Sequence, residues 1–109
     1  MDFVKCLENV KKQYEIYNEN KDFFCVDCNK LLTDYEYIFI AIKNVNGNAV
    51  ICDFANNLQN LNISEEKIKE ICKKYDVIFN DYNLSKIYNS NNDLTQYINC
   101  ILELSKKSS

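Results

Sequence analysis

The dipeptide Asn46-Gly47 lies between two runs of β-branched and aromatic residues, and it constrains this chain more than any other feature. Such a pair suits a two-residue type I′ turn, because both central residues of that turn need a positive φ. The pattern predicts a central β-hairpin with strands near residues 36–43 and 49–54. Counting outward gives a register of Ile42 with Ile51, Ala41 with Cys52, Ile40 with Asp53 and Phe39 with Phe54.

Alternation along these strands gives the hairpin two mostly apolar faces. One face carries isoleucines, namely Ile38, Ile40, Ile42 and Ile51. The other carries Tyr37, Phe39, Ala41, Cys52 and Phe54. We expect helices to cover one face, and the other to be buried, paired with a partner or presented as an aromatic surface.

Apolar residues that recur every three or four positions predict three helices. Their expected bounds are residues 2–17, 64–75 and 93–104. Shorter apolar runs predict strands near residues 22–27, 77–79 and 84–88, the last two joined by a four-residue loop. Together these elements predict an α+β fold, a small antiparallel sheet with helices on one face, in a single domain over residues 1–109 with a flexible tail at 105–109.

Composition argues against several classes of enzyme. The chain has no His and no Arg, so it lacks the imidazole base and the guanidinium fork of many active sites. Its one Gly belongs to the hairpin turn, which leaves none for a phosphate-binding loop. We therefore expect a non-enzymatic protein without a cofactor or metal.

Charge is distributed unevenly along the chain. The net charge is −3, and residues 1–36 hold eight acids against five lysines, whereas residues 37–109 hold eight of each. An acidic domain without Arg is poorly suited to direct nucleic-acid binding, because phosphates must be neutralised by basic side chains. The acidic first third suits a basic protein partner instead.

The six cysteines favour a reduced compartment. The first residues predict an amphipathic helix, not a secretory signal, and no apolar run is long enough for a membrane span. We expect buried, reduced thiols in a cytoplasmic protein. The spacing of Cys25 and Cys28 also fits a redox or zinc motif, but no second ligand pair exists in the sequence.

Acids at the expected strand ends support an alternative, a metal-dependent nuclease. The carboxylates concerned are Asp27, Asp34, Glu36 and Asp53. Alternating aromatic residues at Tyr35, Tyr37 and Phe39 support a protein-binding face, or else a stacking platform for single-stranded nucleic acid. The predicted partner-binding residues are Tyr14, Tyr17, Asp27, Asp34, Tyr35, Glu36 and Tyr37.

The expected first helix has an apolar stripe from Phe3 to Tyr17 that fits either the core or a dimer seam. Three helices are too few to cover this stripe and both hairpin faces. We therefore predict a homodimer, with Tyr14, Tyr17 or the Tyr35/Tyr37 pair at its interface.

The segments EYIFIAIK and NGNAVICDF, followed by a capped helix, two short strands and a Leu-rich helix, resemble small uncharacterised domains of phages and other mobile elements in low-GC bacteria. In those domains the second strand ends in a doubled Asp before Gly, whereas here it ends in Asp53-Phe54-Ala55. The resemblance implies a genomic setting in which small acidic proteins block host defence enzymes, as anti-CRISPR proteins do. It implies no catalytic residue.

Overall fold

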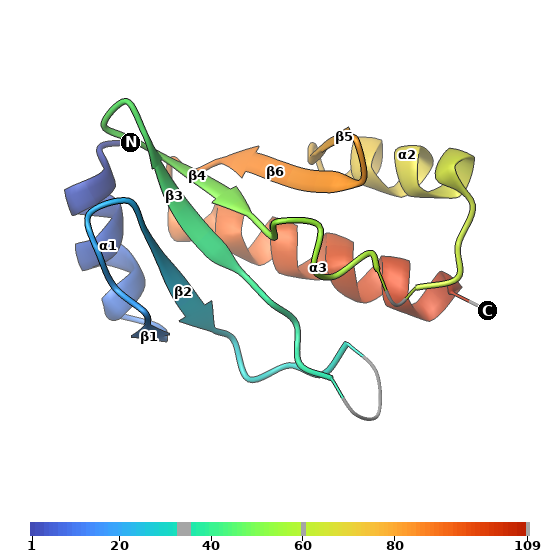
Figure 1. The fold of residues 1–109 in the computed structure, drawn as a ribbon, viewed down its shortest axis with the longest axis horizontal. Coiled ribbons are helices and arrows are strands. Elements are labelled where there is room, and N and C mark those ends of the chain that lie inside the picture. The colour runs from blue at the N-terminus through green and yellow to red at the C-terminus, as the bar shows by residue number, and fades with distance from the viewer. Residues whose placement is uncertain (33–35, 60, 109) are drawn as a thin grey trace.

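The computed structural model describes residues 1–32, 36–59 and 61–108, and it has the predicted α+β fold (Figure 1). Within these ranges three helices pack against a six-stranded antiparallel sheet. The helices are α1 (Phe3–Lys11), α2 (Glu65–Lys74) and α3 (Asn91–Lys107). The strands are β1 (Glu15–Tyr17), β2 (Phe23–Asp27), β3 (Ala41–Val45), β4 (Asn48–Cys52), β5 (Ile78–Asn80) and β6 (Asn83–Ile87).

The central hairpin, β3 and β4, has the predicted turn and register. Asn46 and Gly47 have φ angles of 53° and 89°, and Ile42 pairs with Ile51. The predicted strand bounds were wrong in part, because the ladder runs from Val45–Asn48 only as far as Ala41–Cys52.

Pairing stops there because the chain turns away after β4. Phe54 and Ala55 have positive φ angles of 50° and 63°. The buried side chain of Asn57 takes the place of a strand partner for Phe39. Its Oδ1 accepts from the Phe39 amide at 2.8 Å, and its Nδ2 donates to the Phe39 carbonyl at 2.6 Å. The predicted pairs of Ile40 with Asp53 and Phe39 with Phe54 therefore lie outside the ladder.

The first helix is shorter than predicted. It ends at Lys11 instead of Tyr17, and residues Glu15–Tyr17 form the edge strand β1 against β2. The amides of Gln13 and Tyr14 both donate to the Val10 carbonyl and close the helix. The alternating sequence of residues 14–17 also fits a strand, and pairing with β2 decides between the two forms.

The second hairpin, β5 and β6, has a two-residue turn at Asp81-Tyr82, so the predicted four-residue loop was wrong. Both turn residues have positive φ, at 53° and 59°. The Tyr82 ring meets Phe79 edge-on at 5.5 Å, a contact that helps to hold this unusual turn residue in place.

The last helix is longer than predicted, running from Asn91 to Lys107 instead of 93–104. Residues 105–107, predicted as part of the tail, continue this helix. The Ser105 hydroxyl bonds to the Leu32 carbonyl, and the Ser108 hydroxyl accepts from the Asn62 amide at 2.7 Å. Among the described residues, no helix has the length and apolar character needed to cross a bilayer.

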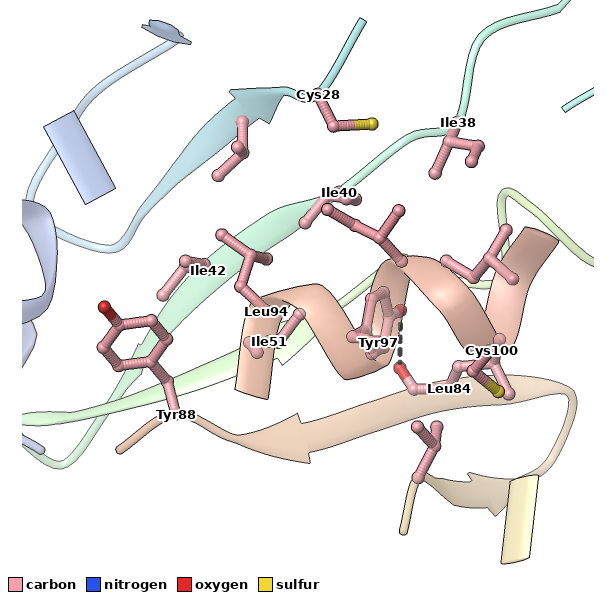
Figure 2. Packing of buried hydrophobic residues seen from close by; sticks show 14 of the residues in the cluster. Cys28, Ile38, Ile40, Ile42, Ile51, Leu84, Tyr88, Leu94, Tyr97 and Cys100 are labelled. Carbon is pink, nitrogen blue, oxygen red and sulfur yellow. Dashed lines mark hydrogen bonds between the residues drawn. The ribbon is translucent and has the colours of Figure 1, made fainter. Parts of the chain in front are cut away.

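The strands are ordered β1-β2-β3-β4-β6-β5, and one face of this sheet holds the core. All three helices contribute to a single hydrophobic cluster with the isoleucine face of the hairpin. Figure 2 shows Ile40, Ile42 and Ile51 directed toward α3, where the Tyr97 hydroxyl donates to the Leu84 carbonyl at 3.4 Å. Within the described ranges no helix packs on the opposite face.

Candidate protein-binding site

The register places one row of side chains across the helix-free face of the sheet, which we call the open face. From edge to edge the row is Tyr17, Cys25, Ala41, Cys52, Ser85 and Ile78. Its outer members Tyr17 and Ile78 are exposed by 44% and 55%, whereas Cys25 and Ala41 are buried. Something on the open face itself must therefore cover the middle of the row.

An aromatic cluster supplies that cover. The Phe54 ring lies 5.9 Å from the Phe23 ring, edge-on, and 6.2 Å from Phe39. Because β3 lies between β2 and β4, the contact between Phe54 and Phe23 bridges over the small side chain of Ala41. The predicted aromatic surface thus exists, with Phe23 as a member that sequence reasoning did not assign to it.

Next to this cluster lies a hollow of about 280 Å³, at the end of β2. We call it the tyrosine hollow. Its lining residues are Tyr17, Val26, Asp27, Asn29, Tyr37 and Ile38. Val26 and Ile38 are buried, while Tyr37 is 64% exposed. The hollow therefore combines buried apolar residues with an exposed aromatic rim and one carboxylate.

Electrostatics in the tyrosine hollow are unbalanced. Asp27 lies directly opposite Glu15 in the ladder, so two exposed acids face each other across β1 and β2. The Asp27 carboxylate accepts from the Asn29 amide at 2.9 Å, and within the described part of the chain neither acid has a cationic partner. The pKa of the Tyr17 phenol is raised, mainly because of burial and further by Cys25 and Asp27.

Three of the seven predicted partner-binding residues, Tyr17, Asp27 and Tyr37, meet in this hollow. Glu36 is exposed beside Tyr37. Tyr14 is half-buried against the core. Because α1 ends before Tyr14 and Tyr17 belongs to β1, the two tyrosines do not share a helical stripe as predicted. Asp34 and Tyr35 lie outside the described residues.

Asp53 has a different setting from the one that a nuclease requires. It is fully buried, and its Oδ1 accepts from the amides of Ala55 and Leu84 at 3.1 and 3.3 Å, while Oδ2 has no hydrogen-bond partner among the described residues. Burial raises the pKa of this carboxyl group. By strand alternation Asp53 lies on the core side and Asp27 on the open face, so the two cannot share an ion.

Among residues 1–32, 36–59 and 61–108, no three metal-ligating side chains converge. Asp34, one of the carboxylates on which the nuclease hypothesis depends, lies outside these ranges.

The Cys25 and Cys28 thiols show no sign of activation. Cys25 lies in a strand and not at a helix start, and burial raises the pKa of both thiols. The six cysteines are all unpaired, although the sulfurs of Cys72 and Cys100 approach to 4.0 Å between α2 and α3. The raised pKa values of Cys25 and Cys28 leave these two thiols protonated at neutral pH and slow to react.

A larger hollow, of about 430 Å³, lies between α2 and α3, and sequence reasoning did not anticipate it. Its one carboxylate already has a cationic partner, because Glu103 accepts from Lys74 at 2.7 Å and from the Tyr75 hydroxyl at 2.8 Å, and its remaining charged lining residues, Lys106 and Lys107, are basic. The tyrosine hollow differs in having acids without such partners.

Comparison of the chain with protein-family models, with curated proteins and with solved structures finds no match. The geometry of the site is thus the basis for the functional argument.

Proposed function

We propose that this chain is a small non-enzymatic inhibitor, anti-CRISPR-like in action, which binds a host nucleic-acid-targeting defence protein by covering a basic surface. The observation that carries the proposal is the tyrosine hollow, where exposed Tyr17 and Tyr37 adjoin acids without cationic partners. Tyrosine is enriched in protein interfaces because it combines a large apolar ring with a hydrogen-bonding hydroxyl.

The surroundings of the hollow support a protein as the ligand. Exposed apolar side chains continue along the open face and its rim, including Leu31, Phe54, Ile78 and Ile87. Apolar side chains exposed on a sheet face that no described helix covers are typical of an interaction site. The acidic first third of the chain would mimic the charge of a nucleic acid toward a basic groove.

The test is inhibition of purified defence nucleases. Each of a panel of nucleic-acid-targeting nucleases from low-GC bacteria would cleave its target DNA or RNA with and without the protein. We expect inhibition of at least one enzyme, and a loss of about tenfold or more with Asp27→Lys, since a central charge reversal opposes the basic surface.

A matched control is Glu66→Lys. Glu66 is exposed on α2, which packs against β5 at the opposite edge of the sheet from β1 (Figure 1). This variant should inhibit like the parent protein. Absence of inhibition and of binding across the panel would overturn the proposal. Equal losses of inhibition in both variants would show that the tyrosine hollow is not the binding site.

The predicted homodimer remains a competing use of the open face. Light scattering at high micromolar concentration would separate the two, because the chain has a mass of 12.9 kDa. A dimer that Tyr17→Ala dissociates would assign this surface to a second copy. A monomer would leave it for a different partner.

A further inference from the structure

We infer that the tyrosine hollow is a receptor for one arginine side chain of the partner, with Tyr17, Tyr37 and Asp27 as its recognising residues. The inference rests on the proposed function and specifies the chemistry of the group that the hollow accepts.

Size supports a single side chain as the occupant. The hollow measures about 280 Å³, which is at or below the lower end of the roughly 300–1,000 Å³ typical of small-molecule sites. It is open on one side and belongs to a sheet edge, so a side chain projecting from a larger body could enter it. Val26 and Ile38 belong to the core and expose only 1% and 4% of their surface, so the apolar surface that the methylene groups of a long basic side chain can contact is that of the Tyr17 and Tyr37 rings.

The walls of the hollow suit a cation. Tyr17 belongs to β1 and Tyr37 to the segment that precedes β3, and both line the hollow with exposed aromatic rings. A cation over a tyrosine face is attracted by the ring quadrupole, by about 0.5–1 kcal/mol at exposed sites and more when it loses water. Asp27 adds a full negative charge beside the rings.

The acid pair provides an independent argument. Glu15 and Asp27 are paired residues of neighbouring strands, and like charges in this position repel each other. Asn29 is the one protein group described as donating to Asp27, so the carboxylate retains further acceptor capacity. A bound cation would satisfy this capacity and relieve the repulsion.

Arginine fits these features better than lysine. Its guanidinium group is planar, stacks on aromatic rings and binds a carboxylate through two parallel hydrogen bonds. It is also more weakly hydrated than an ammonium group, so it loses less on entering a partly apolar hollow.

The experiment is an NMR titration of the isotopically labelled full chain with three capped amino acids. N-acetyl-arginine amide is the ligand, N-acetyl-lysine amide tests the shape of the cation, and N-acetyl-citrulline amide is nearly isosteric with arginine but uncharged. We expect saturable shifts at Tyr17, Asp27 and Tyr37 with arginine, weaker binding of lysine by about threefold or more, and no binding of citrulline.

Two variants test the residues. Asp27→Asn keeps an oxygen for the Asn29 amide and removes only the charge, and Tyr37→Leu removes the ring at an exposed position. Each should weaken arginine binding about fivefold or more, while Glu66→Gln leaves it unchanged. Unchanged shifts elsewhere in the spectrum would show that the variants remain folded.

The outcomes separate this inference from the proposed function. Equal, non-saturating shifts with arginine and lysine, spread over many acids, would overturn the arginine site. If the chain nevertheless inhibits a nuclease and Asp27→Lys abolishes that inhibition, the proposed function stands without it. If arginine binds as expected but no nuclease is inhibited, the receptor stands and the proposed function falls.

Discussion

The two faces of the central hairpin are both rich in apolar residues, but one is buried and the other is partly exposed. On the covered face Ile40, Ile42 and Ile51 are fully buried beneath the helices, whereas on the open face Tyr37 and Phe54 are exposed by 64% and 47%. The difference lies in what each face packs against. Branched aliphatic side chains interlock with helix side chains, while the open face covers its own centre with three phenylalanine rings and leaves its edges exposed.

The comparison shows that alternating apolar residues identify the strand faces that need to be buried. They do not identify which elements bury each face. The covered face should therefore dominate stability, and the open face should contribute little to folding and more to binding. Graded substitutions on the two faces test this division.

The largest effect is expected for Ile51→Ala on the covered face. Removing a fully buried isoleucine from the sheet should lower the free energy of unfolding by about 2–5 kcal/mol, through lost burial and a residual cavity. Urea denaturation monitored by circular dichroism measures this value. A loss below about 1 kcal/mol would contradict the assignment of this face to the core.

A smaller effect is expected for Phe54→Ala on the open face. Its ring is half exposed, so its loss should destabilise the fold by about 1–2 kcal/mol. Because the ring shields the middle of the row, Cys52 should react faster with a thiol reagent in native buffer. Burial raises the pKa of this thiol to about 11 in the parent protein. Unchanged reactivity would show that Phe54 is not the cover.

Asp53 lies where β4 leaves the sheet, on the covered side, and its replacement should change the pH dependence of stability. Because burial raises its folded-state pKa, the folded protein holds the proton more tightly than the unfolded chain. Its contribution is therefore most favourable at acid pH and is lost as pH rises toward neutrality.

In Asp53→Asn this loss should disappear. The difference in unfolding free energy between pH 4 and pH 7, measured by urea titration against the parent protein, should change by an amount on the order of 1 kcal/mol. An identical pH profile for both proteins would contradict the raised pKa.

The smallest effect is expected for Ile87→Thr. Ile87 faces the open side on β6 with 58% exposure, and threonine keeps the β-branched shape that strands favour. We expect a change within about 0.5 kcal/mol by the same denaturation assay. A loss comparable to that of Ile51→Ala would mean that the open face is covered in solution, by a second copy for example.

The part of the fold that sequence predicts best is the part with local chemical causes. Asn46-Gly47 specifies its own turn, and the register of β3 and β4 follows from it. The turn at Asp81-Tyr82 lacks a glycine. Its conformation is stabilised by a contact between the Tyr82 and Phe79 rings, which the turn residues alone do not predict.

Strand β1 and the tyrosine hollow depend on contacts distant in the chain. Residues 14–17 fit either a helix or a strand, and only pairing with β2 selects the strand. The sequence therefore predicted Tyr17, Asp27 and Tyr37 as partner-binding residues but could not place them together in one hollow. Phe23 was missed as a surface residue because its contact with Phe54 crosses an intervening strand.

The order of the strands also bears on the rate at which this chain should fold. Among the strands that the structure describes, four of the five pairs join neighbours in sequence, and the pair of β4 with β6 closes the longest loop, around α2 and β5. Among the strand pairs, closure of that loop has the largest entropy cost, so we expect it to be a slow step of refolding. Because the sequence contains no proline, refolding from urea should lack the slow phase of about 10–100 s that prolyl isomerisation imposes.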